Sequence, residues 1–177
     1  MKKFELTAEF VTNVFGKKLF RIKALVAFGN VEKGELGGFI EKEDNLSHDG
    51  NAWVYGDAQV FGNAQVSGDA RVYGDAQVFG NAQVSGDARV YGNAQVSGDA
   101  RVYGDADYAV VKGFGRCFRT TTFFRCKDKI LRVQCGCFYG DLAQFREIVK
   151  KTHGDSKYAK EYLSIADLME LHFSDEY

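Results

Sequence analysis

The sequence contains no proline, one tryptophan, two methionines and four cysteines among its 177 residues. All four cysteines lie within residues 117–137, which is too few and too local for the disulfide framework of a small secreted protein. No apolar run approaches the roughly 20 residues of a transmembrane helix. The 23 basic and 24 acidic residues nearly cancel, so the overall charge indicates no polyanionic partner. These absences predict a soluble chain of one or two small domains that has no membrane contact.

The N-terminus also lacks targeting features. The basic start Met1–Lys3 is not followed by the apolar stretch of a secretory signal, and Glu5 and Glu9 argue against a transit peptide. We therefore expect a cytoplasmic protein.

Glycine, by contrast, is abundant and regularly spaced. Residues 51–104 form nine unbroken hexads of the pattern Asn/Asp-Ala-x-Val-x-Gly, and residues 57–74 and 75–92 are identical. The β-branched valine favours a very short strand that faces inward, and the Gly-Asx pair favours a sharp turn. A helix is excluded because glycine every sixth residue costs about 1 kcal/mol each. Three strands and three turns make an 18-residue coil, so the repeat predicts a mainly β, triangular β-solenoid of stacked parallel strands.

The hexads also resemble a known repeat. Val-Tyr-Gly-Asp-Ala-Gln is similar to the hexapeptide repeat of left-handed parallel β-helix proteins, and this resemblance implies the left-handed coil and a tendency to trimerise. The segments 37–40 and 49–54 resemble uncharacterised bacterial and prophage hexapeptide-repeat proteins, and Cys135-Gly136-Cys137-Phe138 resembles the tail of such phage proteins. The resemblance implies a phage accessory protein that acts on a host target, such as a component of antiviral defence.

The flanks are expected to cap the open ends of the solenoid. We expect an N-terminal part over residues 1–50, the β-helix over 51–107 and a small α+β unit over 108–177. Residues 4–28 predict a hairpin that turns at residues 16–18. Ile40 and Leu46, six residues apart, predict an irregular first coil.

The C-terminal part changes from strand to helix patterns. Residues 117–138 alternate like a second hairpin that turns at residues 127–129. Asp141 with Gln144 is typical of a helix N-terminus, and a second amphipathic helix begins near Ser156.

Catalysis is the first functional hypothesis, because many hexapeptide-repeat proteins are acyltransferases and others are zinc-dependent carbonic anhydrases. Both chemistries need histidine, as general base or as metal ligand. The hexads contain none, no loop interrupts them, and His48 beside Asp49 fits a polar turn at the entrance to the coils. We therefore predict a non-catalytic protein without a cofactor.

The tail offers two further candidate sites. The cysteines lack the paired CxxC spacing of zinc sites, so we expect thiols and no metal; they are Cys117, Cys126, Cys135 and Cys137. Residues 108–150 hold nine basic and three acidic residues interleaved with phenylalanine. This pattern leaves nucleic-acid binding open, although a hairpin with one solvated face explains it as well.

The outward positions of the coils form the main candidate binding surface. The 18-residue period stacks aromatic and arginine side chains on two adjacent faces, which predicts exposed ladders of the kind that mark an interface. On the first face the candidates are Trp53, Tyr55, Arg71, Tyr73, Arg89 and Tyr91, and on the second Phe61 and Phe79. Self-association is the favoured use, together with a host protein partner. A small-ligand or nucleotide sponge, an acyltransferase-like enzyme and an end-to-end polymer stay open as alternatives.

Overall fold

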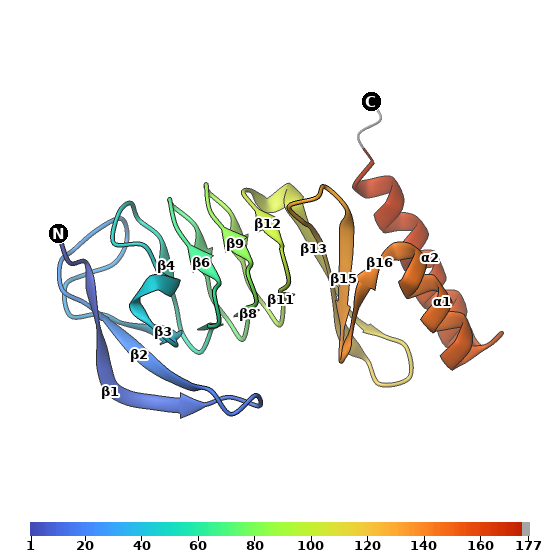
Figure 1. Ribbon diagram of the computed structural model, residues 1–177, viewed down its shortest axis with the longest axis horizontal. Coiled ribbons are helices and arrows are strands. Elements are labelled where there is room, and N and C mark those ends of the chain that lie inside the picture. Colours follow the sequence, from blue (N-terminus) through green and yellow to red (C-terminus); the bar gives the residue numbers. More distant parts are fainter. Residues whose placement is uncertain (175–177) are drawn as a thin grey trace. The chain divides into compact units, whose positions relative to one another are not determined.

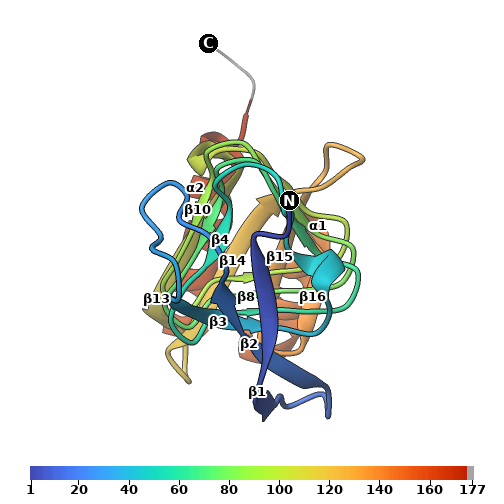
Figure 2. The same cartoon turned by 90° about the vertical axis from the view of Figure 1, so that its left-hand side faces the viewer.

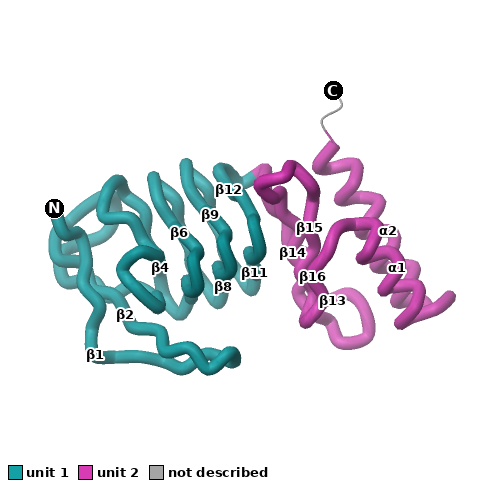
Figure 3. Tube along the Cα trace, viewed as in Figure 1, with its two compact units in different colours: residues 1–105 teal, residues 106–177 magenta. Residues whose placement is uncertain are grey.

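The structure is a computed structural model that describes residues 1–174. The chain forms two compact units, residues 1–105 and 106–177 (Figure 3). Unit 1 is built of β-strands, and unit 2 combines a sheet with two helices (Figure 1). Within the described part of the chain, neither helix has the length and apolar character needed to cross a bilayer.

The hexads of unit 1 form the predicted solenoid, which has about four turns. Each strand pairs in parallel with the strand 18 residues further on, as Val54 does with Val72 and Val60 with Val78. Every hexad valine is fully buried, so the prediction of inward-facing valines is confirmed. Figure 2 looks along the stack of coils. The three stacks of strands are β4 (Trp53–Val54), β7 (Arg71–Val72) and β10 (Arg89–Val90); β5 (Gln59–Val60), β8 (Gln77–Val78) and β11 (Gln95–Val96); and β6 (Gln65–Val66), β9 (Gln83–Val84) and β12 (Arg101–Val102).

The corners between strands explain the glycine and Asn/Asp positions. Gly80 has a φ of +68°, and a Cβ there would lie 2.8 Å from the backbone nitrogen of Gly98 in the next coil. Only glycine fits this left-handed, closely stacked corner. The next residue stacks as well, because the Asn63 amide donates to Asn81 at 3.2 Å, so adjacent coils are tied at their corners.

The N-terminal hairpin and the irregular first coil are both present. β1 (Phe4–Thr12) and β2 (Lys18–Ala24) are antiparallel, and β2 continues to β3 (Leu36–Ile40). Ile40 then pairs with Val60, and Leu46, which follows the short helix η1 (Glu43–Asn45), bridges to Val66. The hairpin and the coils therefore share one six-stranded sheet in the order β1-β2-β3-β5-β8-β11.

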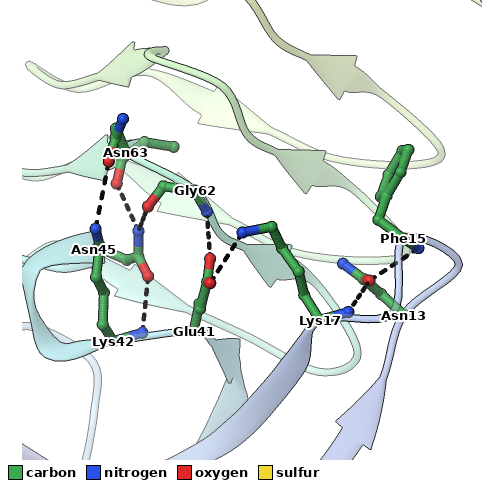
Figure 4. A network of polar contacts seen from close by, with 9 residues as sticks. Asn13, Phe15, Lys17, Glu41, Lys42, Asn45, Gly62 and Asn63 are labelled. Atoms are coloured by element: carbon green, nitrogen blue, oxygen red, sulfur yellow. Dashed lines mark hydrogen bonds and ion pairs between the residues drawn. The ribbon is translucent and has the colours of Figure 1, made fainter.

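Side chains close the first regular coil at the corner that contains Gly62 (Figure 4). The buried Asn45 amide donates to the carbonyls of Gly62 at 3.2 Å and Ala64 at 2.9 Å. The Glu41 carboxylate accepts the Gly62 N–H at 2.6 Å and receives Lys17 Nζ at 3.0 Å. The Gly62 and Ala64 carbonyls, which N–H groups of a preceding hexad would have paired, are thus satisfied by a side chain.

The other two corners of the same coil are closed in the same way. Lys3 Nζ donates to the carbonyls of Ala52 at 2.8 Å and Gly50 at 3.3 Å. Arg21 donates to the carbonyl of Gly56 at 3.3 Å. All three corners at this end are therefore capped, as expected for the terminal coil of a solenoid.

Unit 2 follows the short helix η2 (Asp105–Asp107) and holds a four-stranded antiparallel sheet. The predicted hairpin is confirmed as its two central strands, but the sequence interpretation missed the outer two, because the decaying repeat hid the first and the second is only four residues long. The strands are β13 (Tyr108–Phe114), β14 (Arg119–Arg125), β15 (Leu131–Cys135) and β16 (Phe138–Asp141).

Both predicted helices of unit 2 are confirmed. α1 (Leu142–His153) starts at Asp141, whose carboxylate accepts the Gln144 N–H at 2.8 Å, and α2 (Lys157–His172) starts at Ser156. Phe123 and Val133 of the sheet form a common core with Phe145 of α1 and Tyr162 of α2.

Candidate functional site

Three tyrosines form a ladder on the β4-β7-β10 face of unit 1. Tyr55, Tyr73 and Tyr91 each follow the inward valine of their strand, so the parallel register stacks them. The rings of Tyr73 and Tyr91 are nearly parallel with centroids 5.7 Å apart, while Tyr55 meets Tyr73 edge-on at 6.2 Å. Tyr91 is 55% exposed, and the other two are half-buried. The predicted first ladder therefore exists and reaches solvent.

Two arginines flank this ladder. Arg71 and Arg89 occupy the position before the valine on β7 and β10. Together with Tyr55, Tyr73 and Asn30, which comes from the β2–β3 connection, they line a shallow hollow of about 390 Å³. We call these side chains with Tyr91 the tyrosine–arginine face. The Arg71 guanidinium makes no hydrogen bond or ion pair with residues 1–174, so its donors can serve a partner.

The electrostatics of this face favour the neutral form of Tyr55. Burial raises the pKa of Tyr55, with smaller increases from Glu35 and Tyr73, while the positive charge of Arg71 acts in the opposite direction. A neutral phenol beside a guanidinium presents apolar area together with hydrogen-bond donors.

Trp53 does not belong to this face, and the expectation that it is exposed is wrong. Its side chain is fully buried and meets the rings of Phe28 at 5.3 Å and Phe4 at 6.3 Å, both edge-on. Phe4 belongs to the N-terminal strand and Phe28 to the segment after β2, so these two segments cover the indole. The buried Nε1 of Trp53 has no hydrogen-bond partner within residues 1–174. Trp53 therefore serves as core of the first coil.

The second predicted ladder is also covered. Phe61 and Phe79 stack with parallel rings 5.0 Å apart, but Phe15 at the tip of the N-terminal hairpin lies 5.8 Å from each. Phe61 is only 3% exposed and packs in a cluster with Leu19 and Phe39. The expectation of an exposed Phe61–Phe79 patch is wrong, because the hairpin folds back over this face. Sequence reasoning predicted the hairpin, but no local signal indicated where its apolar tip packs.

His48 has a structural environment. Its Nδ1 accepts the backbone N–H of Lys3 at 3.1 Å, and its ring stacks on Phe4 with centroids 4.3 Å apart. Nε2 lies 3.8 Å from a Glu43 oxygen. The interactions of His48 therefore hold the N-terminal strand against the first coil.

Part of the basic segment of unit 2 is engaged within the fold. Phe123 and Phe124 are fully buried, so they offer no surface for stacking bases. Arg125 donates to the carbonyl of Phe173 at 2.9 Å, and Arg132 is paired with Asp128 at 2.7 Å. Phe118 is the exception, since it is 65% exposed.

Among residues 1–174 the four cysteines form no disulfide; Cys117 and Cys137 are exposed and Cys126 is buried. Among residues 1–174, no three histidine, cysteine or acidic side chains lie together in a way that could hold a metal ion.

Comparison with known proteins agrees with the repeat architecture. A family model described as the YdcK beta solenoid repeat matches residues 64–80, 82–95 and 94–106. The coils are similar to the YdcK β-solenoid repeat. These matches fall in the regular coils and end at residue 106, and together with the observed coils they support a β-solenoid repeat protein. A search of curated proteins found no match.

Proposed function

We propose that this β-solenoid is a non-catalytic binding protein and that the tyrosine–arginine face is its contact surface. The observation that supports the proposal most strongly is the hollow lined by Asn30, Tyr55, Arg71, Tyr73 and Arg89. Tyrosine and arginine are the residues most enriched among interface hot spots. β7 pairs with β4 on one side and with β10 on the other, so the three strands that carry these side chains are held in one register and little conformational entropy opposes binding.

The proposed partner is a protein. The first form to test is a second or third copy of this chain, because closed homo-oligomers are the commonest assemblies and the resemblance to hexapeptide-repeat proteins implies trimers. The resemblance to prophage proteins supports a more specific proposal, in which the chain is a phage accessory protein that engages a host target in the cytoplasm, such as a component of antiviral defence.

The environment of His48 supports the proposal that the protein is not an enzyme. Its Nδ1 lone pair already accepts a backbone N–H, and its ring is stacked on Phe4. A general base needs that lone pair directed at a substrate proton.

The capped first coil favours a discrete assembly over an end-to-end polymer. Lys3, Arg21 and Asn45 bind the carbonyls that a stacked copy would need at this end. A copy could stack here only after these hydrogen bonds break.

A nucleotide is the second candidate ligand. The hollow places tyrosine rings beside two guanidinium groups, which is the chemistry that stacks a base and binds a phosphate. A nucleotide sponge predicts that the purified protein carries an ultraviolet-absorbing ligand that denaturation releases.

The double variant Tyr73→Ser/Tyr91→Ser tests the proposed surface. Serine already occupies the equivalent outward positions 67 and 85, so the fold should persist. We expect self-association or partner binding to weaken by at least ~2 kcal/mol, measured by light scattering and by recovery of the partner from bacterial lysate.

The matched control is Gln65→Ser/Gln83→Ser, which changes two outward residues on β6 and β9 at the same 18-residue spacing. This control should behave as the wild type. Equal mass and equal partner recovery for both double variants would reject the tyrosine–arginine face as the contact surface.

A further inference from the structure

Unit 2 contains a separate hollow of about 460 Å³ at one end of its sheet. Thr121 of β14 lies opposite Cys135 of β15, which in turn lies opposite Phe138 of β16. The loop that precedes β14 and the turn that joins β15 to β16 therefore meet at the same sheet end. These two segments and parts of α1 and α2 line the hollow.

The inner wall of this hollow is apolar and aromatic. Phe145, Val149 and Tyr162 line it and are each less than 10% exposed. The ring of Phe145 lies 5.7 Å from Phe138 and meets Tyr162 edge-on at 5.8 Å. Such a wall favours the apolar body of a ligand.

The rim of the hollow is positively charged. Arg116 and Arg119 line it together with His153, and no aspartate or glutamate does. Neither guanidinium has a hydrogen-bond or ion-pair partner within the described chain. The nearby Glu161 is already engaged, because it accepts the Gly115 N–H at 2.8 Å and lies 4.0 Å from Lys157.

The Cys135-Gly136-Cys137-Phe138 motif shapes this rim. Gly136 has a φ of +58°, and a Cβ at this position would overlap the Arg119 guanidinium. The missing side chain thus lets Arg119 lie over the turn beside the hollow. Tyr162 contributes a neutral hydroxyl, since burial and the neighbouring Cys135 and Cys117 thiols raise its pKa to about 12 although Arg119 opposes the shift.

We propose that this hollow binds an organic acid whose carboxylate contacts Arg116 and Arg119 and whose apolar body of roughly ten carbons packs on Phe138, Phe145 and Val149. The guanidinium pair supplies charge-assisted hydrogen bonds to the head group. The aromatic wall supplies apolar burial for the chain. This site is independent of the tyrosine–arginine face.

Calorimetric titration of the full chain with decanoate tests the proposal, with decanol and decyltrimethylammonium as uncharged and cationic probes. We expect decanoate to bind about tenfold or more tightly than either analogue. Arg116→Gln/Arg119→Gln should weaken decanoate binding by about tenfold or more, and Thr152→Trp should obstruct the hollow from α1. The matched control Lys112→Gln/Lys127→Gln removes two exposed charges away from the hollow and should bind as the wild type, as should Tyr73→Ser.

A second measurement locates the ligand without any substitution. Bound decanoate should slow alkylation of Cys117 and Cys137 by iodoacetamide, read by peptide mass spectrometry. The proposal is overturned if decanoate gives no binding heat at millimolar concentration, if decanol binds equally well, if the double arginine variant binds as tightly as the wild type, or if decanoate leaves alkylation of both thiols unchanged.

Discussion

At the residue scale, neighbouring positions of one hexad have opposite environments. Val78 is fully buried between coils, whereas Gln77 is partly exposed and donates to Gln59 of the preceding coil at 3.4 Å. The same alternation holds along the other short strands except β4, where Trp53 is buried as well, so on those strands stability depends on the valine position far more than on its neighbour.

Val78→Asp should therefore cost several kcal/mol, about 3 or more, because an unpaired carboxylate would enter a narrow apolar interior. Gln77→Glu should change the free energy of unfolding by less than about 1 kcal/mol. Chemical denaturation of the two variants measures the difference. Equal stabilities would contradict the coil model.

Lys3 gives a residue-scale prediction that depends on pH. Burial lowers the pKa of its ammonium group from 10.5 to about 8, and the Asp49 carboxylate only partly opposes this shift. Below pH 8 the group is protonated in both the folded and the unfolded chain. Between pH 8 and 10.5 the unfolded chain binds more protons, so the contribution of this site to stability rises with pH.

The stability of the wild type relative to Lys3→Met should accordingly increase from pH 8 to pH 10. Subtracting the variant removes the titration of the other lysines and the tyrosines. A stability difference that stays flat or falls over this range would show that Lys3 Nζ is not buried against the Gly50 and Ala52 carbonyls.

At the element scale, the N-terminal hairpin decides which solenoid face stays open. Its tip places Phe15 over Phe61 and Phe79, and the buried Leu19 of β2 packs in one cluster with Phe61. On the β4-β7-β10 face Tyr91 is 55% exposed and Tyr73 is half-buried. One of the two aromatic ladders is therefore largely used for internal packing, and the other is the contact surface that we propose.

The contrast between the two ladders also shows which features of the fold could be predicted from the sequence. The coils, the hairpin and both helices were predictable because their signals are local: a glycine period, strand alternation and a capping pair at Asp141. The burial of Trp53 and Phe61 was not predictable, because it depends on contacts with Phe4 and Phe15, which lie about 46 to 49 residues away along the chain. The hollows in both units likewise combine residues from separate segments.

The capping of the first regular coil can be tested through Asn45. Asn45→Leu removes two hydrogen bonds to the carbonyls of Gly62 and Ala64 and should cost about 1–3 kcal/mol, because these groups would stay buried without a partner. Asn63→Ser, at an exposed corner of the same coil, serves as the control and should cost less than half as much. Thermal unfolding that ranks the two variants in the reverse order would contradict the capping role.

At the scale of the whole molecule, unit 1 is a solenoid on which the tyrosine–arginine face is the contact surface that we propose. The coil register spaces the tyrosines and arginines, the capped first coil opposes stacking at that end, and the carboxylate-binding hollow proposed in unit 2 is a separate site. We propose that a partner binds the tyrosine–arginine face.

Site-specific photo-crosslinking is the decisive test of this contact surface. A benzoylphenylalanine residue replaces Tyr73 in one sample and Gln83, on the neighbouring face, in the other, and both proteins are irradiated in bacterial lysate and as purified protein. We expect an adduct of one defined mass from position 73 and none from position 83. An adduct from position 83 with none from position 73 would contradict the proposal.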